Sequence, residues 1–250
     1  MTLIHFTDSA SESVHERAQQ FGLTVTEVLP DSGEYLLADS DGISLCRAGE
    51  KGRVQVDFTG GAARHRRTQG GGELIGKAVN HTAAPTVWDA TGGLGRDSFV
   101  LASLGLNVRT FEQHPAVACL LSDGLDRALQ HPETADIAKR ITLHFGNAAV
   151  LMPQIAQTAG RPDAVYLDPM YPERQKSAAV KKEMAYFHGL VGMAQDESAL
   201  LKAACAVAKK RIIVKRPRLG GFLNGQKPAY QYSGKSTRFD VYLPDNPANI

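Results

Sequence analysis

Asp89-Ala-Thr-Gly-Gly-Leu-Gly-Arg-Asp97 decides the fold of this chain. The stretch follows the apolar residues Thr86-Val-Trp88 and leads into Ser98-Phe-Val-Leu-Ala102, so it predicts a strand, a glycine turn and the start of a helix. Gly93 and Gly95 allow positive φ angles and a close approach of the backbone to a ligand. Because α/β proteins bind nucleoside ligands at the carboxyl ends of their strands, the turn predicts such a ligand.

A second stretch, Asp168-Pro-Met-Tyr-Pro172, follows the buried-strand pattern Ala164-Val-Tyr-Leu167. An exocyclic base amine is a poor nucleophile, so its methylation needs an acceptor that binds the amine and stabilises the positive charge developing on nitrogen. We predict that Asp168 is this acceptor, that Pro169 stiffens the loop and that Tyr171 stacks on a planar base. Taken alone, the stretch also fits a proline-rich turn capped by Asp168.

Short apolar strands alternate with helices through the rest of the chain, which predicts a parallel sheet covered on both faces. The expected strands are 86–89, 107–111, 141–144, 163–167 and 211–215, and the expected helices are 73–80, 96–104, 115–129, 148–157 and 197–208. A hairpin of 229–232 with 238–243 closes the chain. The predicted fold is Rossmann-like α/β, with a mostly parallel seven-stranded sheet that ends in an antiparallel hairpin.

Residues 1–60 are predicted to form a small α+β lobe, and residues 61–250 the larger domain. The lobe combines a helix at 11–21, a strand at 23–29, a hairpin of 34–38 with 43–47 that turns at Asp41-Gly42, and a strand at 53–58. A glycine-bounded basic connection, 60–72, joins the two parts. Its Arg66 and Arg67 are candidates for contacts with phosphate, although an ordinary solvated linker has the same composition.

The residues around the glycine turn argue against a nicotinamide dinucleotide. Its fingerprint needs a third Gly or Ala where this chain has Ser98, and Asp89 and Asp97 would repel a pyrophosphate. A sulfonium cofactor lacks phosphate and carries a positive charge, so the same acids favour it. Asp89, Gly93, Gly95 and Asp97 are therefore candidate cofactor-binding residues.

Further candidate cofactor contacts follow the next two predicted strands. Glu112 ends the second strand, where an acid binds the ribose hydroxyls of a nucleoside. After the third strand, Asn147 and the backbone amide of Ala148 are placed to read an adenine edge. Asn147 also fits the role of a helix cap at this strand-to-helix turn, so both interpretations stay open.

Charge is divided unevenly along the 250 residues. Residues 1–160 hold 13 Lys and Arg against 18 Asp and Glu, a net charge of −5, whereas residues 161–250 hold 15 against 8, a net charge of +7. Such a basic half is typical of a surface that binds a polyanion, although solvated helix faces give similar counts. The candidate RNA contacts in this half are Lys176, Lys181, Lys182, Lys215, Arg216 and Arg218.

Composition also excludes several classes of protein. Cys46, Cys119 and Cys205 are far apart, so we expect free thiols and a reducing compartment. The eight histidines show no metal-binding spacing, and we expect no metal. The amino terminus has no basic leader before an apolar core, and no apolar run approaches the roughly 18 residues of a membrane span. We therefore expect a cytoplasmic protein without a membrane partner.

Together these motifs resemble the class I S-adenosylmethionine-dependent methyltransferases, and in particular the bacterial family that methylates N2 of guanine 1516 in small-subunit (16S) ribosomal RNA. The resemblance covers most of the chain and is densest in 89–97, 166–172, 175–184, 214–217 and 238–242. It implies S-adenosylmethionine as the cofactor, and 16S rRNA or the small ribosomal subunit as the partner. The implied cofactor contacts are Arg96, Asp97, Glu112, Gln113, Asn147, Ala148 and Asp168.

Two positions depart from the general motifs. The first glycine of the usual turn is Thr91, and Met170 replaces the second proline of the amine-methylating motif, as it does in the family pattern. The leading hypothesis is an RNA guanine-N2 methyltransferase. Adenine N6 or a protein glutamine amide is an alternative substrate, because the same hydrogen bonds suit any planar NH2 group. Two further alternatives are a nicotinamide-dependent oxidoreductase, which would bind NADH, and a non-catalytic RNA-binding protein, which would show no turnover.

Overall fold

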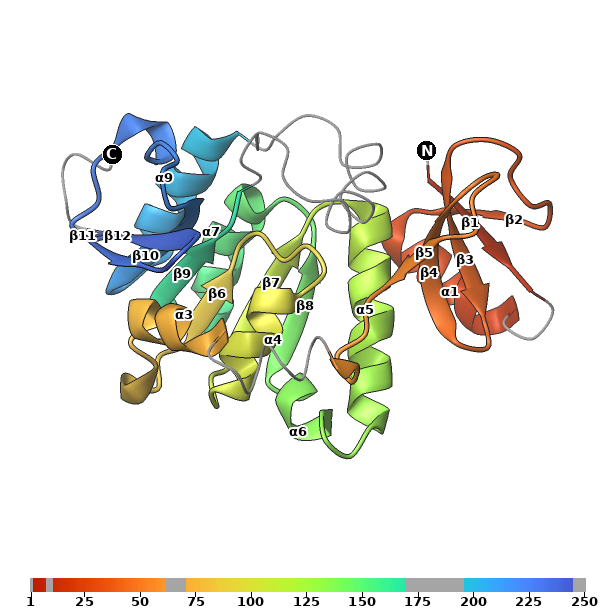
Figure 1. The fold of residues 1–250 in the computed structure, drawn as a ribbon, viewed down its shortest axis with the longest axis horizontal. Coiled ribbons are helices and arrows are strands. Elements are labelled where there is room, and N and C mark those ends of the chain that lie inside the picture. The colour runs from red at the N-terminus through yellow and green to blue at the C-terminus, as the bar shows by residue number, and fades with distance from the viewer. Residues whose placement is uncertain (1, 8–10, 62–70, 170–195, 245–250) are drawn as a thin grey trace.

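The computed structural model describes residues 2–7, 11–61, 71–169 and 196–244. Its larger sheet has seven strands in the order β11-β12-β10-β9-β6-β7-β8 (Figure 1). Their bounds are β6 Val87–Asp89, β7 Val108–Glu112, β8 Ile141–Phe145, β9 Ala164–Leu167, β10 Arg211–Pro217, β11 Tyr230–Ser233 and β12 Thr237–Tyr242. All neighbours from β10 to β8 are parallel, whereas β12 is antiparallel to both β10 and β11. The predicted α/β sheet with its closing hairpin is confirmed.

Helices cover both faces of this sheet (Figure 1). The helices α3 (Gly71–Val79) and α4 (Arg96–Ser103) pack on one face, and α7 (Ala148–Ala159) and α9 (Glu197–Val207) pack on the other. The helix α5 (Pro115–Gln130) lies beyond β8, and the short α6 (Ala135–Ala138) follows it. Since both faces are covered, every residue of β9 is buried, which explains its unbroken apolar run. Two 3-10 segments, at His81–Ala83 and Leu223–Gly225, also lie in the described ranges.

The amino-terminal residues form a second sheet in the order β2-β1-β3-β4-β5. Its strands are β1 Leu3–Phe6, β2 Thr24–Thr26, β3 Glu34–Asp39, β4 Gly42–Arg47 and β5 Arg53–Gln55, with helix α1 at Ser11–Phe21. The predicted hairpin of β3 with β4 is confirmed, but β1 was not predicted. The expected strand at 53–58 ends at Gln55, because the chain then leaves the sheet and Phe58 stacks on Phe99 of α4 at 4.1 Å between ring centroids.

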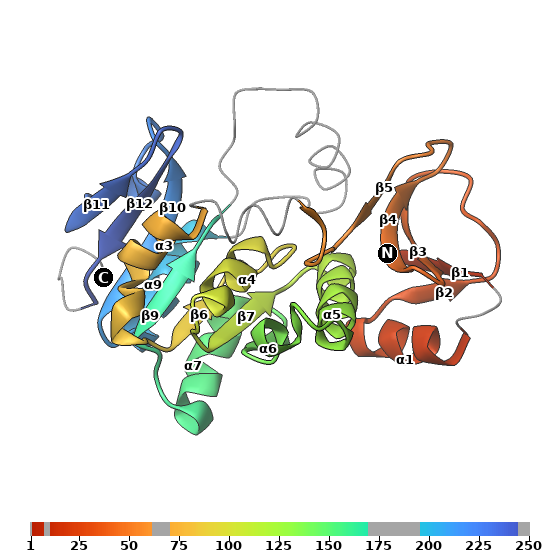
Figure 2. The ribbon, with the colours of Figure 1, turned by 60° about the horizontal axis from the view of Figure 1, so that its bottom comes forward.

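The amino-terminal sheet docks on α5, and one hydrophobic cluster spans the two parts. Figure 2 shows α1 beside α5, where Arg17 donates to Ser122 Oγ at 3.0 Å and pairs with Asp126 at 2.9 Å. The shared cluster packs residues 1–60 against the rest of the chain. The division into two domains, residues 1–60 and 61–250, therefore stays a proposal. In the described ranges, no helix is both long and apolar enough to cross a membrane.

Substituting alanine for Gly124 on α5 is expected to destabilise the protein. In an open helix this change gains up to about 1 kcal/mol. Here a Cβ would overlap the side chain of Val56 and lie 2.8 Å from the Val56 carbonyl oxygen, so we expect a net loss of about 1–3 kcal/mol. Chemical denaturation measures the difference. Val56→Ala removes the overlap with Cγ1, so the losses of the two single variants should add to more than the loss of the double variant. A stabilised Gly124→Ala protein would contradict the packing.

Candidate active site

The glycine turn joins β6 to α4 at the carboxyl edge of the large sheet. Gly93 and Gly95 have φ angles of +51° and +71°, so both positions need glycine. The N–H of Gly92 donates to the carbonyl of Phe111 at 2.8 Å, which ties the turn to β7. A Cβ on Gly95 would overlap Leu121 of α5, whereas the nearest atom to one on Gly93 is 4.0 Å away. The turn is thus packed underneath and open at Gly93.

Asp89 lies under this turn rather than at its surface. It is 1% exposed, its Oδ1 accepts the N–H of Thr91 at 3.1 Å, and its Oδ2 accepts the hydroxyl of Ser98 at 2.5 Å. Ser98 Oγ also lies 2.7 Å from Thr110 Oγ1 on β7. This corrects the expectation that Asp89 binds the cofactor directly. Its carboxyl group instead holds the turn and the first turn of α4 in place.

The burial of Asp89 predicts a pH dependence of stability. Burial raises the pKa of Asp89 from 3.8 to about 7, although the bonds from Ser98 and Thr91 oppose this. A folded-state pKa above the unfolded value means that the contribution of this residue is present below about pH 4 and is lost as the pH rises through about 7. Between pH 5 and pH 8, the wild type should therefore lose unfolding free energy relative to Asp89→Asn. The exposed Asp136→Asn is the matched control and should show no such trend.

Glu112 connects the ends of three parallel strands. Its Oε2 accepts the N–H of Gly93 at 2.8 Å and its Oε1 accepts the N–H of His114 at 2.7 Å. Its carbonyl oxygen accepts the N–H of Gly146 at 2.8 Å, which brings the turn after β8 to the same edge. Burial raises the pKa of Glu112, although the backbone N–H groups of His114, Gly93 and Gln113 oppose the shift. The structure therefore places Glu112 beside the open face of the glycine turn.

Asn147 is the amino-terminal cap of α7. Its side chain accepts the N–H of Ala149 at 2.9 Å, so the cap interpretation is confirmed. Ala148 is fully buried at the first residue of the helix. The contacts of these two residues with an adenine stay a prediction.

Asp168 is brought to the glycine turn by a single direct bond. Its backbone N–H donates to Thr91 Oγ1 at 2.6 Å, and Ala90 N–H donates to the Tyr166 carbonyl at 2.9 Å. The two motifs therefore meet at one edge of the sheet, as the sequence predicts. Thr91, which replaces the usual first glycine, makes this connection. Pro169 is buried directly behind Asp168.

Lys215 on β10 is part of the same cluster. Its Nζ donates to Asp168 Oδ2 at 2.8 Å and to Asp97 Oδ2 at 2.7 Å, and the Tyr166 hydroxyl donates to the same Asp97 oxygen at 2.6 Å. Burial alone would lower the pKa of Lys215, but Asp97 and Asp168 outweigh it and raise the pKa, so the side chain stays cationic. The structure thus bonds this ammonium to two carboxylates, and a contact of Lys215 with RNA phosphate stays a prediction.

Arg216 also differs from its predicted role. Its side chain is 2% exposed and pairs with Glu197 of α9 at 3.2 Å, so it cannot lie against a phosphate backbone. Arg218, the first residue after β10, is exposed. The other predicted residues lie outside the described residues, namely Arg66, Arg67, Met170, Tyr171, Pro172, Lys176, Lys181 and Lys182.

The cluster fits a cationic ligand without phosphate. Asp97, Glu112 and Asp168 surround the open turn, and within the described ranges Lys215 is the cation bound to this acidic set. A pyrophosphate would be repelled there, whereas the sulfonium and the ribose hydroxyls of S-adenosylmethionine suit carboxylate acceptors. In the same part of the chain, no group of three His, Cys, Asp or Glu side chains is arranged to hold a metal ion.

Sequence reasoning missed the roles of Thr91, Tyr166 and Lys215 in this cluster. The signal for Tyr166 was available, because a tyrosine inside a fully buried strand needs a partner for its hydroxyl. Neither the threonine nor the lysine carried such a signal, since each bonds to a residue that is distant in the chain.

Comparisons with known proteins agree with this geometry. The family model described as "Putative SAM-dependent methyltransferase" matches residues 16–244. This chain is a member of that S-adenosylmethionine-dependent methyltransferase family. Two relatives, both named ribosomal RNA small subunit methyltransferase J, come from Neisseria meningitidis serogroup C and Laribacter hongkongensis. The first is 69% identical over 244 residues and covers 98% of each chain, and the second is 48% identical over 248 residues and covers 97% of this chain and 87% of its own.

A solved structure supports the membership. The crystal structure of a SAM-dependent methyltransferase from Neisseria gonorrhoeae is 64% identical, with a TM-score of 0.84, and covers 98% of this chain and 96% of that chain. S-adenosylmethionine is therefore the cofactor of this methyltransferase, and the prediction of a sulfonium cofactor is confirmed. The alternative of a nicotinamide-dependent oxidoreductase is set aside by the same membership.

Proposed function

We propose that this methyltransferase transfers a methyl group from S-adenosylmethionine to the exocyclic N2 of a guanosine in 16S ribosomal RNA. The observation that carries the proposal is the position of Asp168, whose backbone is bonded to Thr91 of the glycine turn at 2.6 Å. The names of the relatives, ribosomal RNA small subunit methyltransferase J, support the small-subunit rRNA as substrate. The choice of guanine N2 rests on the resemblance of the sequence motifs.

The open side of the glycine turn is the proposed cofactor site. Glu112 would bind the ribose hydroxyls, and Asn147 with the amide of Ala148 would contact the adenine edge. Gly93 and Gly95 let the ligand approach the backbone. The other proposed contacts are Arg96, Asp97, Gln113 and Asp168. When bound, the cofactor supplies an electrophilic methyl group on a positively charged sulfur.

Asp168 is the proposed catalytic acceptor. One of its oxygens binds an N–H of the base amine, which draws the nitrogen lone pair out of the ring and aligns it with the methyl carbon. With the cofactor bound, Asp168 would hold the amine nitrogen toward the electrophilic methyl group, and the nitrogen would become the acceptor of that group. The nitrogen then loses one proton to the Asp168 carboxylate, which passes it to water. Pro169 keeps the loop rigid, and Tyr171 is proposed to stack on the base.

Recognition of the RNA is assigned to the basic carboxyl-terminal part of the chain. Its net charge of +7 over residues 161–250 suits a polyanion. The proposed phosphate contacts are Arg66, Arg67, Lys176, Lys181, Lys182 and the exposed Arg218. The proposed partner, the small ribosomal subunit or its rRNA, places the protein in the cytoplasm, with no membrane or metal partner.

Methyl transfer to purified rRNA tests this function. The rRNA is taken from a strain in which the gene is deleted, as naked 16S rRNA and as assembled small subunits, and is incubated with the protein and labelled S-adenosylmethionine. Nucleoside mass spectrometry should detect N2-methylguanosine at one position. A product of N6-methyladenosine would move the assignment to adenine, and label in protein alone would move it to a glutamine amide. Calorimetry should show binding of S-adenosylmethionine but not of NADH.

A further inference from the structure

Lys215 occupies the space between the candidate acceptor and the first turn of α4. The parallel pairing of β9 with β10 runs to Leu167 opposite Val214, so Asp168 and Lys215 follow at the same level of the sheet. The ammonium lies 2.8 Å from Asp168 Oδ2 and 2.7 Å from Asp97 Oδ2. The side chain is 29% exposed, so most of it is enclosed by the protein. Lys215 therefore links the residue after β9 to the helix after β6.

Asp168 is held at two points. Its backbone N–H is bonded to Thr91 Oγ1 at 2.6 Å, and its Oδ2 accepts the Lys215 ammonium. A carboxylate fixed in this way keeps one orientation, and Oδ1 remains as the oxygen that can receive the amine of the substrate. Misalignment by a fraction of an ångström reduces the rate of an in-line displacement. A fixed acceptor should therefore support a higher rate of methyl transfer than a rotating one.

The charges around Asp168 give Lys215 a second effect. In the described part of the chain, the ionisable groups whose charges interact with Asp168 are Asp89, Asp97, Tyr166, Lys215 and Arg216. Burial raises the pKa of Asp168 and Asp97 raises it further, whereas Lys215 and Arg216 lower it. Without the ammonium, the carboxyl group would hold a proton at higher pH. A protonated carboxyl carries a donor where the amine of the substrate needs an acceptor.

We propose that Lys215 is a positioning residue for methyl transfer, which keeps Asp168 a carboxylate with one oxygen bound and leaves the other to the amine of the substrate. The proposal rests on the function proposed above. It gives Lys215 a role inside the site in place of a contact with RNA phosphate.

A titration of Asp168 tests the electrostatic part without any substrate. The protein is labelled with ¹³C at aspartate side-chain carboxyls, and the Asp168 signal is assigned by its loss in Asp168→Asn. In Lys215→Met the pKa of Asp168 should rise by about one pH unit or more. Lys215→Gln keeps a hydrogen-bond donor but removes the charge, so it should also raise the pKa of Asp168. It replaces Lys215→Met in the titration if the methionine variant does not fold. Lys210→Met is the matched control, since Lys210 is exposed, pairs with Asp163 and precedes β10.

Kinetics test the positioning part. With saturating S-adenosylmethionine and rRNA, Lys215→Met should lower kcat by about tenfold or more, and the acid limb of its pH–rate profile should move to higher pH. The affinity for S-adenosylmethionine should stay the same or increase, because removing the ammonium leaves a more negative site. The KM for rRNA should change by less than about threefold, and Lys215→Arg should recover part of kcat.

Different outcomes overturn different statements. An unchanged titration of Asp168 together with a kcat within twofold of the wild type would show that Lys215 does not position the acceptor. A raised KM for rRNA with a shallower salt dependence, and an unchanged kcat and acid limb, would make Lys215 a phosphate contact instead. If the wild type transfers no methyl group to rRNA, the proposed function fails, whereas the titration still reports on the pairing of Lys215 with Asp168.

Discussion

Replacing Asp168 with alanine is expected to slow methyl transfer at saturating substrate by a factor of about 100 to 1,000. In the proposed function this carboxylate stabilises positive charge that develops on the amine nitrogen only in the transition state, so the loss should appear in kcat. The fold should tolerate the change, because Lys215 keeps its bond to Asp97 at 2.7 Å. Single-turnover transfer of labelled methyl groups to rRNA measures the effect.

Two further variants sharpen this expectation. Asp168→Asn keeps an acceptor oxygen but loses the negative charge, so its rate should fall between the wild type and Asp168→Ala. Asp136→Ala removes an exposed carboxylate on α6 and should transfer at the wild-type rate. A rate for Asp168→Ala within a factor of two of the wild type would show that another group receives the amine.

Replacing Arg238 with alanine should lower the free energy of unfolding by about 3–5 kcal/mol, because it leaves the buried charge of Asp240 unpaired. Asp240 is 0% exposed and binds Arg238 through both oxygens, at 2.8 and 3.1 Å. Arg238 Nη1 also donates to the carbonyls of Arg218 and Gly220 at 2.9 and 2.7 Å. The variant would therefore lose the hydrogen bonds that hold the loop after β10, as well as the ion pair. Denaturation with urea measures the difference.

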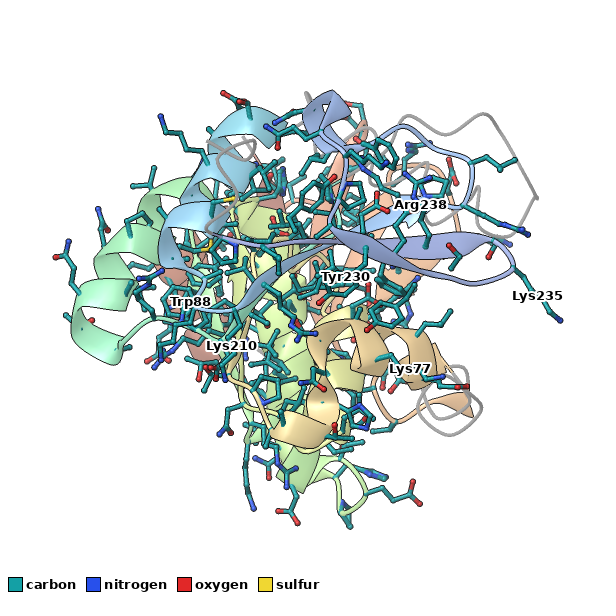
Figure 3. All side chains as sticks on the ribbon, turned by 90° about the vertical axis from the view of Figure 1, so that its left-hand side faces the viewer. Lys77, Trp88, Lys210, Tyr230, Lys235 and Arg238 are labelled. Atoms are coloured by element: carbon teal, nitrogen blue, oxygen red, sulfur yellow. The ribbon has the colours of Figure 1, made fainter. Side chains whose placement is uncertain are left out.

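The same hairpin supplies the control for this measurement. Lys235 extends from the turn between β11 and β12, whereas Arg238 lies among the side chains of the sheet (Figure 3), so Lys235→Ala should change stability by less than about 0.5 kcal/mol. The double variant Arg238→Met with Asp240→Asn should be more stable than Arg238→Ala, since no full charge is then left buried without a partner. A loss below about 1 kcal/mol in Arg238→Ala would contradict the importance of the pair.

The positions of the two motifs were predictable because each depends on short-range rules. Glycines with positive φ mark the turn after β6. The length of β7 and its distance in sequence from this turn then predict that Glu112 lies at the end of that strand. The cap at Asn147 likewise depends on residues two positions away. The parallel sheet then brings every such strand end to one edge, so the meeting of Asp168 with the glycine turn follows from the order of strands.

By itself, the sequence determined the alternation of strands and helices, the glycine turn and the strand ends that carry Glu112 and Asp168. Only the tertiary structure decided the partners of Lys215 and Arg216, which are adjacent in the chain and look like one basic patch. Successive residues of a strand point to opposite faces, and helices cover both faces of this sheet. Lys215 therefore meets Asp97 of α4 on one face and Arg216 meets Glu197 of α9 on the other, because their partners come from distant segments that no local pattern links to β10.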